Sequence, residues 1–530
     1  MIALTAAFTV AAAVIAIPRI ATADIVPAAA TVEDEGAGCP VPALPDPGAL
    51  PTVAKLPDPF KKIDGNRITT ASEWQCRREE IKKQAERYVY GEKPTKPQTV
   101  TGTVTSTTIT VNVSHQGKSS SFSAKVELPG GSGPFPAVVV LGGFGADTAA
   151  IKAAGAAIIT YDPYAVGKEG TPRTNKQGAF YSIYGSSSST GLLMAWAWGV
   201  SRIIDVIEQS GGTILRADAT GVTGCSRFGK GAFVIGAFDQ RIALTMPIES
   251  GSAGVPIFRG IPGEGAQSLS SAYGEQPWLG DAFGSFTSSP ARLPVDTHEM
   301  VAMVAPRGLF IMDNPHIVNL GPKSASVAAL GGAEVYKALG AGENITYWSD
   351  IQDGNHCANR PEWRTPLQQN IQKFLLKTGN AAGTMRISSK AAGNLAEWRD
   401  WQTPVLGTGS PSDPPPGPGP SDPPPGPSDP PPSQVGCSAT VSVNSWNGGF
   451  VGTVKVTAGA ADLNGWTVAL TLPAGATITS SWNTTRTGAS GPVRFANVSY
   501  NGRVAAGQST EFGFQATGTS AAMTPTCTPA

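Results

Sequence analysis

A proline-rich segment in the last third of the chain sets the strongest limit on how the chain can fold. Between residues 404 and 435 the motif Ser-Asp-Pro-Pro-Pro-Gly-Pro recurs, with almost no apolar side chains. Such a segment cannot bury a core and favours an extended polyproline conformation. The sequence therefore predicts a semi-rigid linker between two separately folded units, at residues 39–403 and 436–530.

The overall composition agrees with more than one domain. The 530 residues are more than one hydrophobic core usually serves. Lys plus Arg and Asp plus Glu both number 39, so charge gives no reason to expect a nucleic acid or a membrane surface as partner. A charged fraction of only 15%, with 63 Gly, 45 Pro and 6 Cys, is typical of an extracellular protein with three disulfides.

The N-terminus has features of an export signal. Residues 2–17 are apolar or small, and Ala21-Thr22-Ala23 fits a cleavage site, so we expect a signal peptide over residues 1–23. No basic residue precedes the apolar run, which is unusual for such a signal. A membrane anchor is the alternative, but Pro18 and Arg19 interrupt the run before a comfortable span. We expect residues 24–38 to be a disordered mature N-terminus.

Apolar runs and helical patterns alternate along residues 39–403. Buried strands are predicted at 136–141, 157–161, 219–223, 242–246, 308–312 and 345–348, and helices at 192–210, 324–340 and 362–377. This alternation indicates an α/β fold with a mostly parallel sheet covered on both faces. Residues 98–128 alternate Thr, Val and Ser and predict antiparallel strands that lead into the sheet. In helix 192–210, Arg202, Asp205 and Glu208 are interpreted as a solvent-facing side, which favours a core helix over a membrane helix.

A glycine-rich turn separates the strand at 219–223 from the next helical segment. Its sequence, Gly224-Cys225-Ser226-Arg227-Phe228-Gly229, is a G-x-S-x-x-G variant of the nucleophile elbow, in which a sharp turn lifts a serine oxygen above the sheet. An ordinary βα turn is the alternative. With the alternating elements, the elbow predicts an α/β-hydrolase three-layer sandwich with Ser226 as nucleophile.

A serine nucleophile needs a base, and the chain has four histidines. His115 lies in the early strands, and His298 and His316 are better explained as structural or rim residues. His356 follows the last predicted strand, where α/β-hydrolases carry their base. The acid that orients the imidazole is either Glu249 or Asp313, because each directly follows a predicted strand, and position alone does not separate them.

The cysteines are placed so that three pairings explain all six. Cys225 precedes the predicted nucleophile and Cys357 follows the predicted base, so a bond between them would tie the two loops together. Cys39 and Cys76 would then pair, and Cys437 and Cys527 would join the ends of the C-terminal unit. A reactive Cys225 thiol is the alternative, and it fits an exported chain poorly.

Two further groups lie beside Ser226 in the sequence. The Arg227 guanidinium, the backbone N–H groups and a donor from Gly142-Gly143-Phe144 could hold a tetrahedral oxyanion. Lys230 is one helical turn beyond the nucleophile and is expected at the same pocket mouth. No cluster of His, Cys and Asp has metal-ligand spacing, so we expect no metal and no cofactor.

Residues 436–530 contain short alternating runs rich in Thr, Val, Ser, Gly and Asn, which predict an all-β sandwich. Trp446, Trp482 and Tyr500 each stand beside Gly or Asn, which favours exposure of their flat faces for stacking on sugar rings. The alternative is that they are core residues, as we expect for Trp466.

With these motifs in place, residues 39–403 resemble the glucuronoyl esterases of carbohydrate esterase family 15. Gly224-Cys225-Ser226-Arg227-Phe228-Gly229-Lys230 is similar to that family's G-C-S-R-x-G-K motif, and Pro247-Ile248-Glu249-Ser250-Gly251 to its acid segment. The resemblance implies Glu249 as the acid, with Asp313 as a possible second acid. It also implies Arg227 as oxyanion donor and Lys230, Gln267 and Glu275 as ligands of the uronate hydroxyls. A disulfide beside the nucleophile and the histidine is a further feature of the family.

The resemblance has one departure and one extension. Where fungal members carry a tryptophan before Leu-Gly, this chain has Asn319-Leu320-Gly321, so the stacking wall is missing or supplied from elsewhere. The tail resembles a family 2 carbohydrate-binding module, whose three planar binding positions fall on Trp446, Trp482 and Tyr500. Three such positions resemble the type that binds crystalline cellulose rather than xylan.

The two resemblances imply a secreted, extracellular serine esterase that cleaves esters between 4-O-methyl-glucuronic acid on xylan and lignin alcohols. We expect glucuronoxylan–lignin esters and a cellulose surface as partners, neither nucleic acid nor membrane, and a monomer. One alternative is an acetyl xylan esterase or another carbohydrate esterase on the same triad. The other is a cellulose-binding protein with an inactive α/β domain.

Overall fold

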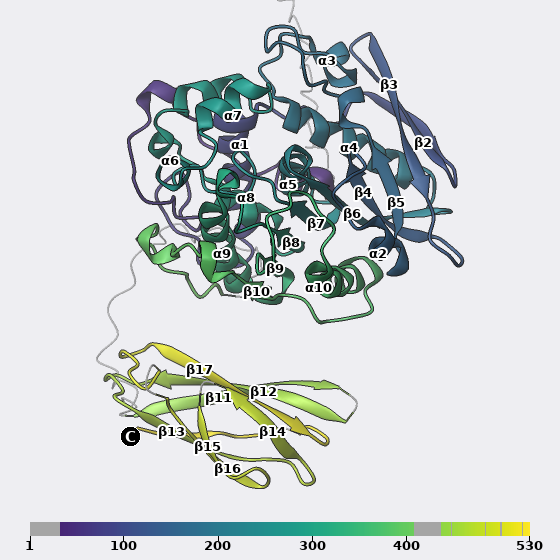
Figure 1. Cartoon of the computed structure of the whole chain (residues 1–530). Coiled ribbons are helices and arrows are strands. Elements are labelled where there is room, and N and C mark those ends of the chain that lie inside the picture. The colour runs from purple at the N-terminus through teal and green to yellow at the C-terminus, as the bar shows by residue number, and fades with distance from the viewer. Residues whose placement is uncertain are drawn as a thin grey trace, which may run out of the picture. The chain divides into compact units, whose positions relative to one another are not determined.

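The computed structural model divides the chain into two units, with the boundary inside the Pro-rich segment, between Asp413 and Pro414 (Figure 1). It describes residues 32–407, 436–446, 448–482, 484–498, 501–521 and 523–529. The predicted signal peptide, residues 24–31 and most of the linker lie outside these ranges. None of the described helices is long and apolar enough to cross a membrane.

The first unit is built on a ten-stranded sheet in the order β1-β2-β3-β5-β4-β6-β7-β8-β9-β10. Strands β4 to β10 run parallel, while β1 to β3 form an antiparallel edge that pairs with β5. The bounds are β1 Thr99–Val104, β2 Thr108–His115, β3 Lys118–Glu127, β4 Phe135–Leu141, β5 Ala157–Tyr161, β6 Leu215–Cys225, β7 Ile242–Ile248, β8 Gly308–Met312, β9 Ile345–Trp348 and β10 Met385–Arg386. The predicted strands, including the antiparallel ones in 98–128, are confirmed.

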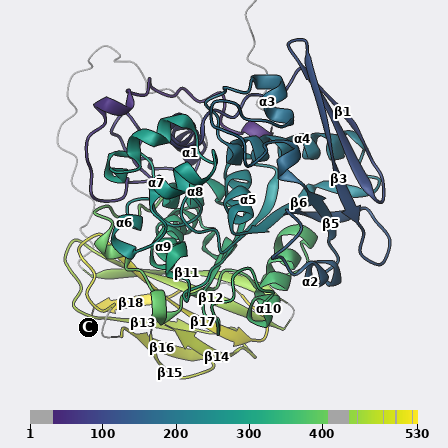
Figure 2. The ribbon, with the colours of Figure 1, turned by 45° about the horizontal axis from the view of Figure 1, so that its top comes forward.

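Helices cover both faces of this sheet. They are α1 Trp74–Ala85, α2 Thr148–Ala153, α3 Ala179–Tyr184, α4 Leu192–Gln209, α5 Arg227–Phe238, α6 Ile261–Glu264, α7 Leu269–Glu275, α8 Thr297–Val304, α9 Pro322–Ala338 and α10 Pro361–Ile371. Side chains of α4, α5, α8 and α9 share one hydrophobic cluster, and those of α2 and α10 share another. Figure 2 shows α2 and α10 side by side.

Strand β4 shows why the sheet is buried on both faces. Ala137, Val139 and Leu141 belong to the cluster of α4 and α5, whereas Val138 and Val140 belong to the cluster of α2 and α10. Successive side chains of a strand point to opposite faces, so a continuous apolar run fills both layers. This confirms the predicted α/β-hydrolase three-layer sandwich.

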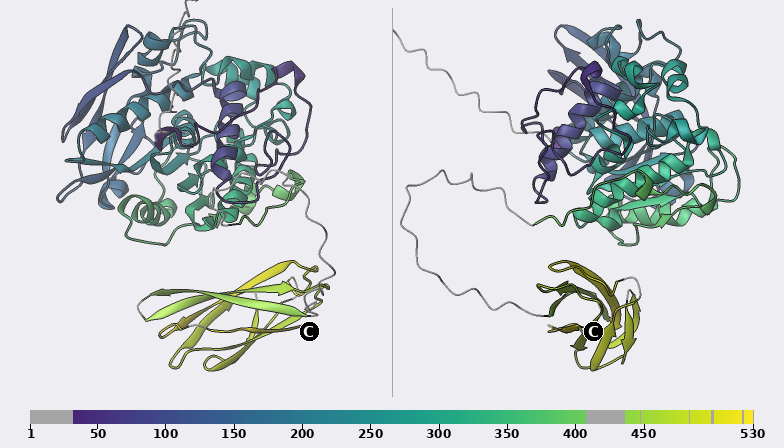
Figure 3. Two further views of the ribbon diagram at one scale, coloured as in Figure 1. Left: turned by 180° about the vertical axis from the view of Figure 1, so that it is seen from behind. Right: turned by 90° about the vertical axis from the view of Figure 1, so that its left-hand side faces the viewer.

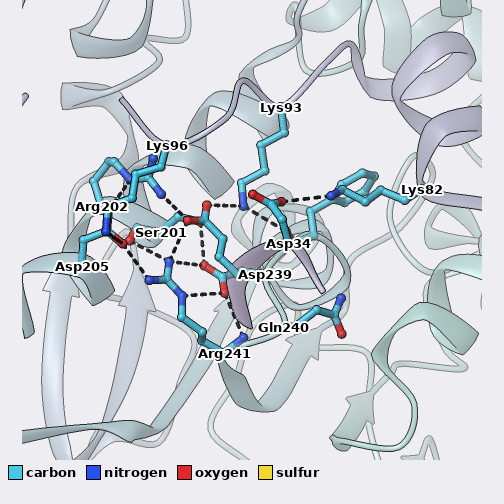
Figure 4. Close-up of polar contacts among 12 residues, drawn as sticks. Asp34, Lys82, Lys93, Lys96, Ser201, Arg202, Asp205, Asp239, Gln240 and Arg241 are labelled. Carbon is cyan, nitrogen blue, oxygen red and sulfur yellow. Dashed lines mark hydrogen bonds and ion pairs between the residues drawn. The ribbon is translucent and has the colours of Figure 1, made fainter. Parts of the chain in front are cut away.

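The interpretation of helix α4 as having a solvent-facing side was wrong for two of its three charged residues. Arg202 and Asp205 are both fully buried and form an ion pair at 2.8 Å, and Asp205 also pairs with Arg241 at 2.7 Å. Figure 4 shows this cluster, to which Lys93 and Asp239 also belong. Only Glu208 is partly exposed, with 43% of its side chain accessible. A charged residue on a helix indicates a solvent-facing side only where no other part of the chain forms an ion pair with it.

Arg202 of helix α4 also pairs with the N-terminal part of the chain, for which disorder was predicted up to residue 38. The structure instead describes residues 32–38 with Glu33 buried, accepting hydrogen bonds from Lys93 at 2.8 Å and Arg202 at 2.5 Å. In Figure 3 the purple N-terminal part lies along the outside of the first unit. At the other end, the N–H of Gly407 donates to the carbonyl of Thr69 at 2.8 Å, so the start of the predicted linker contacts the first unit.

The second unit is a two-layer β-sandwich, as predicted. Its described strands form the sheets β11-β12-β17-β14 and β15-β16-β13-β18. The bounds are β11 Cys437–Trp446, β12 Gly449–Ala458, β13 Trp466–Thr471, β14 Thr477–Trp482, β15 Thr485–Thr487, β16 Pro492–Ala496, β17 Ser509–Thr517 and β18 Thr526–Pro529. Trp466 is fully buried and stacks on Phe512, which confirms it as a core residue.

The aromatic side chains predicted to bind cellulose belong to this second unit. Trp446 and Trp482 fall at the ends of β11 and β14, but their side chains lie outside the described part of the structure, as does Tyr500. Their role remains a prediction. The Cys437–Cys527 disulfide is present and joins β11 of one sheet to β18 of the other.

Candidate active site

Ser226 occupies a strained turn between β6 and α5. Its backbone has φ 59° and ψ −123°, a conformation that L-residues rarely adopt. The Ser226 N–H donates to the carbonyl of Ile248 at 3.0 Å. A Cβ on Gly229 would lie 2.5 Å from the same carbonyl oxygen, so only glycine permits this close packing. The turn therefore has the backbone of a nucleophile elbow.

The predicted acid and base meet above the ends of parallel strands β7 and β9. Glu249 directly follows β7, and His356 lies in the loop between β9 and α10. His356 Nδ1 lies 2.6 Å from Glu249 Oε2, which also accepts the Cys357 N–H at 2.8 Å. Asn314 Nδ2 donates to the other oxygen at 3.1 Å. Because Nδ1 faces a buried carboxylate, Nε2 is left for the serine side of the ring.

Asp313, the rival acid, has different partners. It is buried, and its oxygens accept the Asn314 N–H at 2.9 Å and the Tyr347 hydroxyl at 3.0 Å. Burial and, to a lesser extent, the charge of nearby Glu249 raise the pKa of Asp313 to about 7, against the lowering effect of these hydrogen bonds. A carboxyl turned toward Tyr347 is poorly placed to orient His356, so the geometry favours Glu249 as the acid.

The remaining histidines take structural positions, in agreement with the prediction. His298 is fully buried, with Nε2 2.9 Å from the carbonyl oxygen of Pro57. His316 Nε2 lies 2.9 Å from the carbonyl oxygen of Ile351. His115 ends β2 at the antiparallel edge of the sheet. His356 is thus the histidine of this site.

The Cys225–Cys357 disulfide is present, with the two Cα atoms 5.7 Å apart. It joins the residue before Ser226 to the residue after His356, so both loops are fixed to each other. Cys39 and Cys76 also pair, and no described cysteine is free, which excludes the reactive Cys225 thiol. The Ser226 hydroxyl forms no hydrogen bond to another described residue, so its transfer of a proton to His356 belongs to the proposal below.

Arg227 belongs to a polar group with three other side chains, Glu169, Gln267 and Glu275, that are far from it in the sequence. Its Nη1 donates to Glu169 at 2.8 Å, and its Nη2 lies 3.9 Å from Glu275. Gln267 Nε2 donates to Glu275 at 2.7 Å, so the predicted sugar ligands form one polar group. Sequence reasoning missed Glu169, which lies in the loop after β5.

Lys230 is buried beneath this group. Its ammonium donates to the carbonyl of Ser250 at 2.6 Å and lies 5.2 Å from the ring centre of Trp278. Burial lowers the pKa of Lys230 to about 8, although the carboxylate of Glu275 acts in the opposite direction. Such an amine can serve as a hydrogen-bond donor that changes charge near neutral pH.

Two expectations about neighbouring loops need refinement. The N–H of Gly142 donates to the carbonyl of Tyr161 at 3.0 Å, so within Gly142-Gly143-Phe144 only the later residues are left as oxyanion donors. At the site of the missing tryptophan, Val318 and Asn319 are exposed, and the Asn319 carbonyl accepts the Gln267 N–H at 3.0 Å. No aromatic residue stands at this position of the loop.

Comparison with known proteins agrees with this geometry. The family described as "Glucuronyl esterase, fungi" matches residues 111–340, and "Cellulose binding domain" matches residues 437–529. The 4-O-methyl-glucuronoyl methylesterase of Hypocrea jecorina is 38% identical over 377 residues, which cover 70% of this chain and 80% of the relative. The Neurospora crassa protein of the same name is 38% identical over 368 residues, covering 68% and 92%.

Solved structures show the same relationship. The glucuronoyl esterase catalytic domain of Hypocrea jecorina superposes with a TM-score of 0.65 at 36% identity, covering 69% of this chain and all of the other. A mutant glucuronoyl esterase of Sporotrichum thermophile, in complex with methyl 4-O-methyl-β-D-glucopyranuronate, has the same TM-score and identity and covers 70% of this chain. This chain therefore belongs to the glucuronoyl esterase family of carboxylic ester hydrolases.

Proposed function

We propose that this protein hydrolyses esters of glucuronic acid side chains of xylan with lignin alcohols. The observation that carries the proposal is the hydrogen bond between His356 and Glu249, which lies beside the strained Ser226 turn and the group of Arg227, Gln267 and Glu275. The relatives named 4-O-methyl-glucuronoyl methylesterase support the uronate ester as the substrate class.

In the first half of the reaction, Ser226 Oγ attacks the ester carbonyl while His356 Nε2 takes its proton. Glu249 holds the imidazole through Nδ1 and stabilises its charged form. The Arg227 guanidinium and the backbone N–H groups at the start of α5 hold the oxyanion. The tetrahedral intermediate then collapses, and His356 gives its proton to the leaving alcohol.

In the second half, water attacks the acyl-enzyme. His356 takes a proton from the water, a second tetrahedral intermediate forms on the same donors, and Ser226 leaves with the proton returned by His356. The product is a free uronate anion. Lys230, Gln267 and Glu275 are proposed to bind hydroxyls of the sugar ring throughout, because Gln267 donates to Glu275, Glu275 lies 3.9 Å from Arg227, and Lys230 and Arg227 both lie over the Trp278 ring.

The C-terminal unit is proposed to hold the enzyme on cellulose through Trp446, Trp482 and Tyr500. Support comes from its match to a cellulose-binding family over residues 437–529. Attachment through the linker would raise the local concentration of enzyme at the cell wall. We also propose that the protein is exported and acts as a monomer; three disulfides in the described residues support an oxidising compartment.

The test is hydrolysis of benzyl glucuronate beside 4-nitrophenyl acetate, by the wild type and by Ser226→Ala. We expect the wild type to cleave the uronate ester and the variant to lose at least a thousandfold of that activity. Activity on the acetate alone would keep the nucleophile but overturn the uronate assignment. Binding to cellulose without hydrolysis of either ester would indicate a binding protein.

A further inference from the structure

Glu169 is a buried carboxylate that contacts Arg227, the predicted oxyanion donor. Only 7% of its side chain is exposed. Oε2 accepts the Tyr164 hydroxyl at 2.7 Å and Arg227 Nη1 at 2.8 Å, while Oε1 accepts Trp278 Nε1 at 2.5 Å. Two neutral donors thus fix the carboxylate, and the fixed carboxylate holds the guanidinium of Arg227, the residue that follows Ser226.

The charges around Arg227 balance. Arg227 and Lys230 are the two cations of the group, and the Trp278 ring lies within 5.7 Å of the first and 5.2 Å of the second. Glu169 and Glu275 are the two anions, at 2.8 Å and 3.9 Å from Arg227 nitrogens. A guanidinium without such counter-charges is a strong ligand for a carboxylate. With them, its attraction for an anion is reduced.

This balance matters because substrate and product differ in charge. A uronate ester is neutral at its carboxyl group, whereas the free uronate released by hydrolysis is an anion at neutral pH. An uncompensated arginine next to the nucleophile would favour the product over the substrate. We propose that Glu169 is a positioning residue and counter-charge for Arg227, which fixes the guanidinium beside Ser226 and weakens binding of the anionic uronate product.

The inference rests on the proposed function for its substrate class, but its test does not need hydrolysis. In a Ser226→Ala background, calorimetry would measure the affinities of glucuronate and of neutral methyl glucuronate, and their ratio reports the charge preference of the site. Glu169→Gln is expected to raise the ratio in favour of glucuronate roughly tenfold, since it removes one negative charge. In the active enzyme, the inhibition constant for glucuronate should fall to the same extent.

Two comparisons separate this role from a structural one. In an Arg227→Gln background, Glu169→Gln should shift the ratio much less than it does beside Arg227, because the part of the effect that acts through the guanidinium is gone and only the direct repulsion between Glu169 and the anion remains. Asp281→Asn is the matched control: this carboxylate also pairs with an arginine, Arg173, at 3.1 Å, but it does not contact Arg227. It should leave the ratio at the wild-type value.

Each outcome decides the point. An unchanged ratio in Glu169→Gln, or an equal shift in the Arg227→Gln background, would overturn the inference. If Glu169→Gln does not fold, as judged by its thermal midpoint, Glu169→Asp shortens the side chain with its charge kept; it should lower kcat while the ratio stays at the wild-type value, and a shifted ratio would count against a charge effect. If the variants change the affinity ratio as expected but the wild type cleaves no uronate ester, only the proposed function is overturned.

Discussion

Glu249 Oε2 lies 2.6 Å from Nδ1 of His356 and 2.8 Å from the backbone nitrogen of Cys357. One carboxylate oxygen thus holds both the predicted base and the backbone of the next residue. Cys357 is also bonded to Cys225, the residue before Ser226. The loops that carry Ser226, Glu249 and His356 are therefore all connected through Cys357. The identity of the acid and the role of the disulfide can each be tested.

Replacing the acid should separate Glu249 from Asp313. In Glu249→Gln the amide can no longer stabilise a charged imidazole or fix its tautomer, so kcat for benzyl glucuronate should fall roughly 10³- to 10⁴-fold. Asp313→Asn changes a group that accepts the Tyr347 hydroxyl rather than His356, and should cost less than about tenfold. Steady-state kinetics on both variants would check this, and a reversed ranking would make Asp313 the acid.

The disulfide at the site should matter for activity as well as for stability. Its sequence separation is 132, so the Cys225→Ser, Cys357→Ser pair should lose about 5 kcal/mol of unfolding free energy by loop-closure entropy. The variant should also lose kcat beyond the loss of folded protein, because the His356 loop is released from the elbow. Denaturant unfolding and kinetics normalised to folded enzyme would measure both.

The Cys39–Cys76 bond provides the matched control. Its separation is 37, so its removal should cost about 4 kcal/mol, while kcat per folded molecule stays at the wild-type value. If both double variants lost kcat equally, the disulfide at the site would have no special part in arranging the catalytic loops.

The elbow could be predicted from sequence because its determinants are contiguous. Gly224, Ser226 and Gly229 fix a local backbone path, and the alternation of strands and helices supplied its place in the sheet. The acid could not be decided from local pattern, since Glu249 and Asp313 both follow a strand. Only the side-chain directions in three dimensions separate a carboxylate facing His356 from one facing Tyr347.

Contacts between residues far apart in the sequence could not be predicted from local patterns. Glu169 meets Arg227 58 positions later and Trp278 109 positions later, and no spacing rule connects them. Arg202 was interpreted as solvent-facing because helical periodicity gives information only about its own helix. Its partner Glu33, 169 positions earlier, accepts a hydrogen bond from it. The polar residues after the strand at 157–161 were a usable signal, because that strand ends at the same edge of the sheet as the elbow.

Lys230 should give the enzyme a pH-dependent KM. Burial lowers the pKa of Lys230 to about 8, so its charged form predominates below that pH and declines as the pH rises above it. If the ammonium binds the sugar, KM for benzyl glucuronate should rise above pH 8. In Lys230→Met, KM should be high and independent of pH in this range. A wild-type KM that stays flat on both sides of pH 8 would contradict this role.

Glu33 should contribute to folding rather than to catalysis. It lies 3% exposed among Lys93, Arg202 and Arg241, and removing one partner of a buried ion pair typically costs about 3–5 kcal/mol. Glu33→Gln should therefore lose stability of this order in denaturant unfolding, with kcat per folded molecule unchanged. Glu35→Gln is the control: that side chain is 49% exposed, and its loss should cost less than about 1 kcal/mol.

The stabilisation by Glu33 should also depend on pH in a defined direction. Burial raises the pKa of Glu33, but the ion pairs with Lys93, Arg202 and Arg241 outweigh burial and hold the pKa below its usual 4.5. A carboxyl with a lowered folded-state pKa stabilises fully above its unfolded pKa and loses that effect as the pH falls. The stability gap between wild type and Glu33→Gln should thus be complete at neutral pH and narrow below pH 4.5. A gap independent of pH would show that Glu33 acts through packing rather than charge.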